Sequence, residues 1–288
     1  MRPLTRTRSG DTPIVRIETL TERGLPQCLA LARDREWLAE DAKWRMLFEV
    51  ATVLGVRDDS GAVIATVAHA RPTTSLDFVG MLLVASEHEQ RGIGRALMRH
   101  VLDRSWPRPV LLHATPRGRP LYDSLGFAEV GATGTYFRRP EPTSGVGRSR
   151  PATPADRDAI VDLDARIYGD ARPELVERLP RFAEQVRVLE RCGQLAGYVA
   201  AWRNVDGLVV GPLAARTAEA AQDLVADVLR DSTAPVRLDL DRAQPEMHEW
   251  ATAQGFVWRN DTVRMAARHH GSLHRTDVVW SPFTQATG

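Results

Sequence analysis

The chain repeats one pattern of strands, turns and helices, and this repeat constrains its fold more than any other feature. Residues 53–70 and 186–203 both have the pattern of two strands joined by a polar turn. Residues 109–127 and 235–256 each begin Pro-Val-x-Leu and end Gly-Phe, with a strand followed by a helix. A length of 288 residues suits about two ordinary domains, so we expect two halves of similar fold.

The segment between the two repeats has the composition of a linker. Residues 138–151, RRPEPTSGVGRSRP, are rich in Pro, Gly and Ser and have no apolar periodicity. We therefore place a first domain at residues 1–140, a linker at 141–151, and a second domain with a polar C-terminal tail at 152–288. Because strands and helices alternate in both halves, we expect a mixed α/β architecture.

Composition excludes several classes of protein. A formal net charge of +1 gives no indication of nucleic-acid binding. No apolar stretch approaches the ~20 residues of a membrane helix, and the basic N-terminus lacks the apolar run of a signal peptide. The two cysteines, Cys28 and Cys192, lie far apart, which favours a reduced cytoplasmic protein without a disulfide framework.

Motifs for several other chemistries are missing from the sequence. Lys43 is the only lysine, so there is no phosphate-binding loop of the G-x-x-x-x-G-K-[ST] type, and there is no G-x-S-x-G nucleophile elbow. His88 and His248 are each followed by Glu but lack the second histidine of H-E-x-x-H. His270 and His274 lie in a polar segment. We therefore expect no metal site.

Two glycines stand at the start of an amphipathic helix, where glycine costs roughly 1 kcal/mol relative to alanine. Gly92 and Gly94 follow the strand DFVGMLLV, and Arg91 and Arg95 flank them. A helix N-terminus has backbone N–H groups without intrahelical partners, and a phosphate binds there when no side chain blocks it. The segment EHEQRGIG therefore predicts an anion-binding turn. Leu97 stands where a dinucleotide fingerprint needs its third glycine, which excludes a Rossmann site.

This turn and helix, EQRGIGRALM, together with the preceding strand and the downstream LYDSLGF, resemble the GNAT superfamily of acyl-CoA-dependent N-acetyltransferases. The motif of that family, [Q/R]-x-x-G-x-[G/A], holds the pyrophosphate of coenzyme A with backbone amides and matches at Gly92 and Gly94. Glu89 stands where the family usually has Gln or Arg. The resemblance implies an acetyl-CoA site formed by Gln90, Arg91, Gly92, Ile93, Gly94 and Arg95. It also implies that a backbone N–H around Leu83 or Val84 polarises the acyl carbonyl.

Tyr122, in LYDSLGF, matches the residue that typically protonates the departing coenzyme A thiolate in this family. A phenol with a pKa of about 10 is protonated at neutral pH and can donate to a thiolate. Where the family often has an asparagine after the preceding strand, this chain has Thr115 and Pro116. The general base stays unassigned, and the candidates are Glu49, Asp77, Glu87 and His113.

The second half resembles the family only through its layout. An ungapped alignment of GMLLVASEHEQRGIGRALMRHVL with GLVVGPLAARTAEAAQDLVADVL places Glu219 at the position of Gly92, and Ala251 falls on Tyr122. We therefore expect two tandem GNAT-like domains, each a twisted mixed, largely antiparallel sheet flanked by helices, with one working coenzyme site and a degenerate second copy.

Two functions stay open on these grounds. The resemblance implies an acyltransferase that moves an acetyl group from acetyl-CoA to a primary amine by direct transfer in a ternary complex. The alternative is a non-catalytic acyl-CoA-binding sensor or interaction protein, which Glu89 and the missing asparagine favour. The acceptor is a small-molecule or peptide amine of undetermined identity. The acyl-chain preference, any ligand of the second half and the oligomeric state are also open.

Overall fold

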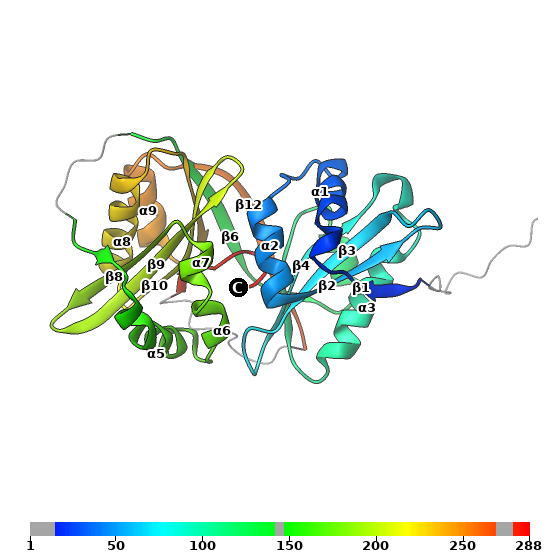
Figure 1. Cartoon of the computed structure of the whole chain (residues 1–288), viewed down its shortest axis with the longest axis horizontal. Helices are drawn as coiled ribbons and strands as arrows, with labels where there is room; N and C mark the ends of the chain where they lie inside the picture. The colour runs from blue at the N-terminus through cyan, green and yellow to red at the C-terminus, as the bar shows by residue number, and fades with distance from the viewer. Residues whose placement is uncertain (1–14, 142–146, 269–278) are drawn as a thin grey trace, which may run out of the picture.

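The structure, a computed structural model, describes residues 15–141, 147–268 and 279–288. Figure 1 shows two lobes, one built mainly from each half of the chain, with strands of both halves between them. Both halves contain the same run of three strands, a helix, a strand, a helix and a strand, as the repeat in the sequence predicts, whereas the second half has one more α-helix before this run and a short strand after it.

The first half contains six described strands and four α-helices. The strands are β1 (Ile17–Thr19), β2 (Ala51–Arg57), β3 (Val63–Ala70), β4 (Asp77–Val84), β5 (Val110–Ala114) and β6 (Ala128–Arg138). The helices are α1 (Leu25–Asp34), α2 (Asp41–Val50), α3 (Ile93–Ser105) and α4 (Arg119–Asp123).

The second half contains seven described strands and five α-helices. Its strands are β7 (Arg150–Pro151), β8 (Gln185–Arg191), β9 (Gln194–Asn204), β10 (Gly207–Ala215), β11 (Val236–Asp241), β12 (Val257–Ala267) and β13 (Val279–Ser281). Its helices are α5 (Arg157–Tyr168), α6 (Pro173–Val176), α7 (Leu179–Phe182), α8 (Ala218–Asp231) and α9 (Pro245–Ala253).

All described strands belong to one continuous sheet, because the last long strand of each half lies in the sheet of the other half. The strand order is β1-β2-β3-β4-β5-β12-β6-β11-β10-β9-β8-β7, and β13 pairs with β10. β12 pairs with β5 of the first half, β6 pairs with β11 of the second, and β6 and β12 pair with each other. Most pairs are antiparallel, and β4·β5 and β10·β11 are parallel. The expected mixed, largely antiparallel sheet with flanking helices is confirmed, whereas the exchange of strands was not predicted from the sequence.

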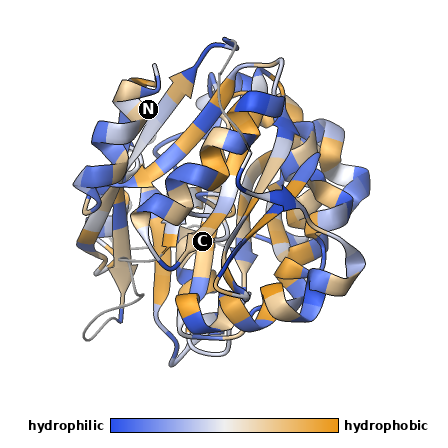
Figure 2. Ribbon diagram, turned by 90° about the vertical axis from the view of Figure 1, so that its left-hand side faces the viewer, coloured by the Kyte–Doolittle hydropathy of each residue, from blue (hydrophilic) through white to orange (hydrophobic). Residues whose placement is uncertain are grey.

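Hydrophobic cores lie on both faces of the sheet. On one face of the first half, α3 buries Leu97, Met98 and Val101 against strand residues such as Leu112, and α8 and α9 form a similar core in the second half. On the other face, a single core joins α1 and α2 to α5, α6 and α7. Figure 2 shows hydrophobic residues along the strands and hydrophilic residues on the helices around them. The shared core holds the two halves together.

Residues 279–288 differ from the polar tail that the sequence predicts, because they are buried between the lobes. Phe283 and Ala286 belong to the core that both halves share. A Cβ at Gly80 would lie 2.4 Å from the Cβ of Ala286, so only glycine allows this segment to approach β4 so closely. The segment is therefore part of the hydrophobic core between the two lobes.

Candidate functional site

A cleft opens where β4 separates from β5. The two strands pair only from Asp77 to Val79 on β4, opposite Val110 to Leu112 on β5. Met81 has a φ of 52°, and the register of β4 against β3 shifts beside it, which bends β4 away. The cleft has a volume of about 210 Å³. It is lined by Arg35, Trp37, residues 79–84, Glu89, Gly94, His113, Thr115, Arg117, Gly118, Leu121 and Tyr122.

The backbone of β4 presents hydrogen-bond donors to this cleft. The N–H of Ala85 donates to the carbonyl of Ile64 at 2.8 Å, which places that N–H on the β3 side. Because N–H groups alternate between the two edges of a strand, the N–H of Leu83 also faces β3, and those of Leu82 and Val84 face the cleft. Of the two donors expected from the sequence, this geometry favours Val84, and it adds Leu82.

The helix that follows begins without a side-chain cap. Gly92 is the N-cap of α3 with a φ of 80°, a left-handed conformation that disfavours any residue with a Cβ. Gly94 is different: a Cβ there would lie 3.5 Å from Cγ2 of Val84 and 3.6 Å from Cδ2 of Leu121, which is ordinary contact. The backbone therefore favours glycine at 92, where a side chain would be strained, but not at 94. The first N–H groups of α3 are left without intrahelical partners beside the cleft.

The other predicted residues of the turn surround this helix start. Gln90 is left-handed, with a φ of 59°. Arg91 donates to the carbonyl of Glu87 at 2.8 Å, and Arg95 donates to the hydroxyl of Ser124 at 2.9 Å. The side chain of Ile93 is buried in the core beneath α3, so only its backbone is available at the turn.

Glu89, the departure from the family motif, is paired with two arginines. Its carboxylate lies 2.5 Å from the guanidinium of Arg35 and 2.8 Å from that of Arg117. Arg35 follows α1 and Arg117 precedes α4, so the three side chains come together only in the fold. Two guanidinium groups against one carboxylate leave a net positive charge at the cleft. Sequence reasoning missed both arginines because no local spacing connects them to Glu89.

Tyr122 lies in the wall of the cleft and is 8% exposed. Burial raises the pKa of its hydroxyl to about 12, so the phenol is protonated at neutral pH. Its ring meets that of Phe127 edge-on, with centroids 5.8 Å apart. The carbonyl of Tyr122 accepts from the N–H of Phe127, as that of Ala251 accepts from Phe256, so the expected correspondence of these two positions is confirmed.

Two of the carboxylates considered as a base lie on the surface, away from the residues that line the cleft. Glu49 is exposed and lies 3.6 Å from Arg178. Glu87 is exposed and lies 3.4 Å from His88. Neither is among the cleft-lining residues, so the geometry disfavours both as bases.

Asp77, the first residue of β4, is fully buried in a cluster of charged side chains and is not among the residues that line the cleft. Its carboxylate lies 2.8 Å from Nε2 of His69 and 2.7 Å from Arg108. Burial by itself would raise the pKa of Asp77, but the hydrogen bond from His69, the nearby Ser105 hydroxyl and the charge of Arg108 lower it overall. Asp77 therefore stabilises the fold as a carboxylate.

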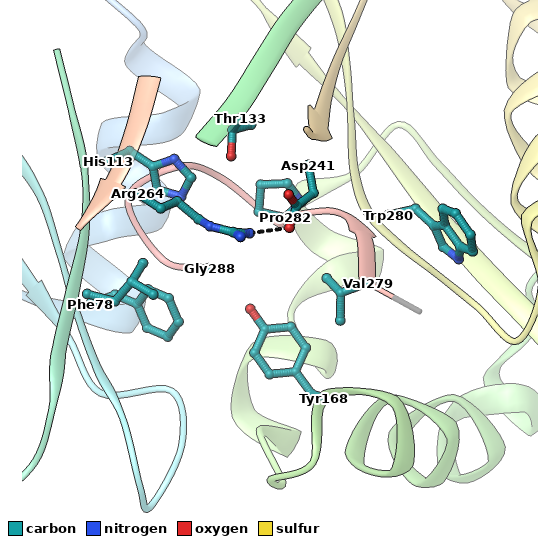
Figure 3. Close-up of a pocket in the computed structure, with 11 residues that line it drawn as sticks. Phe78, His113, Thr133, Tyr168, Asp241, Arg264, Val279, Trp280, Pro282 and Gly288 are labelled. Carbon is teal, nitrogen blue, oxygen red and sulfur yellow. Dashed lines mark hydrogen bonds and ion pairs between the residues drawn. The ribbon is translucent and has the colours of Figure 1, made fainter. Parts of the chain in front are cut away.

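His113 is the remaining candidate, and it lines two pockets. One is the cleft, and the other is a small pocket of about 40 Å³ between the halves. Figure 3 shows this second pocket, in which the guanidinium of Arg264 points toward Asp241, 2.5 Å away, with Tyr168 on the opposite side. Because Leu112 packs under α3, the alternation of β5 turns His113 to the face between the lobes.

The second half has lost the turn itself. β4·β5 pairs Asp77 with Val110 and β10·β11 pairs Leu208 with Val236, so Gly80 corresponds to Gly211. The ungapped alignment of the sequence, which paired it with Gly207, is therefore wrong here. The connection to the helix spans residues 85–92 in the first half and only 216–217 in the second.

The space that forms the cleft in the first half is also filled in the second. Thr217, and not Glu219, is the N-cap of α8, and its hydroxyl accepts from the N–H of Ala220. β13 pairs with β10 at Leu213 and Ala214, the positions that correspond to Leu82 and Leu83. The helix start is thus capped, and a strand of the same chain lies where the cleft would open.

Other site types find no support in the described residues. Among them, no group of three His, Cys, Asp or Glu side chains is arranged to hold a metal ion. His270 and His274 lie outside the described residues. In the part of the chain that the structure covers, no helix is long and apolar enough to cross a membrane.

Comparison with known proteins identifies the family of this fold. Two models of the acetyltransferase (GNAT) domain match residues 38–136 and 160–280. The uncharacterized N-acetyltransferase YitH of Bacillus subtilis is 22% identical over 220 residues, covering 74% of this chain and 77% of YitH.

Solved structures resemble the whole chain. A putative acetyltransferase from Pyrococcus horikoshii has a TM-score of 0.83 at 15% identity and covers 99% of both chains. A tandem GNAT protein from the clavulanic acid biosynthesis pathway has a TM-score of 0.66 at 16% identity and covers 90% of this chain and all of that one. The chain belongs to the GNAT family of acetyltransferases and contains two GNAT domains in tandem.

Proposed function

We propose that the first half binds acetyl-CoA and transfers its acetyl group to a primary amine. Family membership supports acyl transfer in general. The observation that carries the finer proposal is the uncapped start of α3 at the left-handed Gly92, beside a cleft that Tyr122 lines. The second half, with a capped helix and a filled cleft, supports no second coenzyme site in this proposal.

The residues around the cleft fit coenzyme A. The free N–H groups at the start of α3 suit a pyrophosphate, and Arg35 and Arg117 add positive charge at the same place. The cleft-facing N–H groups of Leu82 and Val84 suit an extended chain of amides running beside β4. Acetyl-CoA supplies the acetyl group as a thioester, which an amine can attack.

The chain's own groups would then stabilise the transfer. The acceptor nitrogen forms a bond to the acyl carbon as the carbon–sulfur bond breaks. A backbone N–H of β4 facing the cleft donates to the carbonyl oxygen, a contribution of typically 10²–10³ in rate for one donor. Holding both reactants in one cleft removes much of the entropic barrier.

Tyr122 donates its hydroxyl proton toward the departing sulfur. A thiol has a pKa of about 8.5, so a phenol with a pKa of about 12 is the weaker acid. Burial in the same cleft also raises the pKa of a thiol, because it destabilises the thiolate as it does the phenolate. The difference between the two pKa values is therefore smaller in the cleft than in water. The donated hydrogen bond therefore strengthens as the sulfur gains charge, and the hydroxyl is present as a donor throughout the neutral pH range.

The test uses the purified full chain with acetyl-CoA and a panel of small primary amines, with release of free thiol as the readout. Tyr122→Phe should lower kcat about 10²-fold or more while leaving the Kd for acetyl-CoA unchanged. Equal turnover by this variant removes Tyr122 from the mechanism. Binding of acetyl-CoA without transfer to any amine favours the sensor alternative.

A further inference from the structure

A further cavity lies in the second half, where α5, α6 and α7 lie beside β8 (Figure 1). Its volume is about 660 Å³, compared with about 210 Å³ for the cleft beside β4. Protein pockets that bind small molecules typically have volumes of roughly 300–1,000 Å³. The residues that line the cavity include 151–154, the first turn of α5 and 183–187, and none of them lines the cleft. The two sites are therefore separate.

A broken helix accounts for the space in this cavity. In the first half, α2 is one continuous helix of ten residues directly before β2. In the second half, the same place in the order of elements holds α6 and α7, which have four residues each. Pro180 stands in the first turn of α7, and its ring has no N–H with which to continue a helix from α6. Two short helices fill less of the space beside α5 than one continuous helix does.

The walls of the cavity are mainly apolar and belong to the core that the two halves share. Nine of the sixteen lining residues are Ala, Val, Leu, Ile or Pro. Ile160, Val176 and Leu179 are at most 5% exposed and are members of the shared core. Ala183 and Val186 pack against the same core. Because burial of apolar surface is favourable, these walls suit a ligand that is itself mainly apolar.

The charged residues that line the cavity are all paired with an opposite charge. The ion pairs are Arg157–Glu177 at 2.5 Å, Arg187–Asp231 at 2.8 Å and Arg203–Glu184 at 2.6 Å. Among the described lining residues, no guanidinium or carboxylate is therefore left to pair with a charged ligand. Burying an ion without a partner is unfavourable. The cavity therefore favours a neutral ligand.

One polar side chain in the wall lacks a hydrogen bond. Gln185 lines the cavity, and within the described part of the chain its buried Oε1 atom has no hydrogen-bond partner. A buried acceptor that lost its contact with water on folding is stabilised when a donor reaches it. A ligand with an N–H or O–H group supplies such a donor.

We infer that this cavity binds a neutral, mainly apolar small molecule that carries a hydrogen-bond donor for Gln185. This site lies in the half whose coenzyme turn is lost, so it gives that half a ligand of its own. The inference does not rest on the function proposed above, because the cavity and the cleft share no lining residue.

The first experiment titrates the full chain with N-phenyl-1-naphthylamine, a neutral probe with one N–H whose fluorescence rises in apolar surroundings. We expect saturable binding of one probe per chain. 8-Anilino-1-naphthalenesulfonate has the same rings and an added sulfonate, so it should bind at least about tenfold more weakly. The absence of saturable binding by the neutral probe overturns the site. Equal or tighter binding of the sulfonate contradicts the neutral class of ligand.

Variants of the wall then locate the bound probe. Ala183→Phe and Val186→Trp place larger side chains at the cavity and should weaken binding of the neutral probe at least about tenfold. Two such variants are used so that one remains if the other folds poorly, which its Tm reveals. Ala253→Phe is the matched control, because Ala253 is exposed on α9 and does not line the cavity. An unchanged Kd in both folded cavity variants shows that the probe binds elsewhere and overturns the site.

The hydrogen bond to Gln185 is tested by removing each partner in turn. The N-methyl derivative of the probe has no N–H and should bind more weakly than the probe itself. Gln185→Met removes the acceptor and should abolish this difference. A difference of equal size in the variant removes Gln185 from the site.

Competition with acetyl-CoA separates this inference from the proposed function. Acetyl-CoA should leave the Kd of the neutral probe unchanged, because the two sites share no residues. Displacement of the probe by acetyl-CoA would place it in the cleft and overturn the inference. If the chain binds no acetyl-CoA, the proposed function fails, and the wall variants still decide whether the cavity binds the probe.

Discussion

Replacing Gly92 with alanine perturbs the candidate coenzyme turn at the position where the backbone favours glycine. With a φ of 80°, an alanine there pays roughly 1–2 kcal/mol for a left-handed conformation. If the turn keeps its shape, that cost lowers Tm by about 2–8 °C for domains of this size. If the turn relaxes instead, the N–H groups at the start of α3 change direction. Because a phosphate binds at the helix start when no side chain blocks it, the added methyl group also hinders binding if the turn keeps its shape. In both cases we expect acetyl-CoA to bind at least about tenfold more weakly, a loss of 1.4 kcal/mol or more.

Gly94→Ala is the matched control, two residues further along the same helix. Its Cβ would meet Val84 and Leu121 at 3.5 and 3.6 Å, so the methyl group fits. Alanine also favours the helix by up to about 1 kcal/mol relative to glycine. This variant should keep or raise the Tm of the free protein and should keep its affinity for acetyl-CoA.

Thermal unfolding with and without acetyl-CoA measures both the Tm of each free protein and its stabilisation by the coenzyme. A ligand at 100 times its Kd adds about 2.7 kcal/mol to the free energy of unfolding. The wild type and Gly94→Ala should show this increase, and Gly92→Ala should show a smaller one at the same concentration. Equal increases in all three proteins would refute the argument that the left-handed turn forms the anion site.

Two further predictions concern charges near the cleft and in the core. Glu89→Gln leaves Arg35 and Arg117 without their carboxylate, so acetyl-CoA should bind more tightly at low salt and lose this gain at high salt; calorimetry showing weaker binding at both salt concentrations would contradict it. Because the folded pKa of Asp77 lies below its unfolded value of about 3.9, its stabilisation is present above that pH and is lost as the pH falls through the lowered pKa. In denaturant titrations Asp77→Asn should therefore unfold more easily than the wild type at pH 7, this difference should narrow as the pH falls below about 3.9, and the kcat of the variant should be unchanged. A kcat reduced as strongly as in Tyr122→Phe would return Asp77 to the candidate bases.

Local features of the site were predictable from the sequence because each depends on a few neighbouring residues. Gly92 stands where the backbone turns left-handed, and α3 begins at the next residue, as its apolar pattern indicates. Tyr122 lies one turn before Gly126 and Phe127, and the same turn recurs before Phe256 in the second half. A short pattern is sufficient for such features.

The exchange of strands was not predictable from the pattern of apolar residues. β6 and β12 occupy equivalent places in the repeat, and they lie side by side in the sheet. Exchanging two equivalent neighbouring strands preserves the alternation of each, so the sequence pattern is the same with or without the exchange. Only the pairing of β12 with β5 and of β6 with β11 distinguishes the two arrangements.

The loss of the turn in the second half was hidden by an alignment that matched apolar residues without a gap. The strand register shows that Gly211 is the equivalent of Gly80. With this alignment, only Arg216 and Thr217 connect the strand to the helix in the second half. The pairing of Glu89 with Arg35 and Arg117 was beyond sequence reasoning for a different reason. The three residues come from different parts of the fold, so no spacing in the chain links them.

The most direct test of the account is the stoichiometry of acetyl-CoA binding, measured by isothermal titration calorimetry on the purified full chain. We expect one molecule of acetyl-CoA per chain, bound in the first half, because α3 begins without a side-chain cap beside the cleft, whereas Thr217 caps the equivalent helix α8. Two molecules per chain would show that the second half also binds the coenzyme, and no binding would contradict the proposed function.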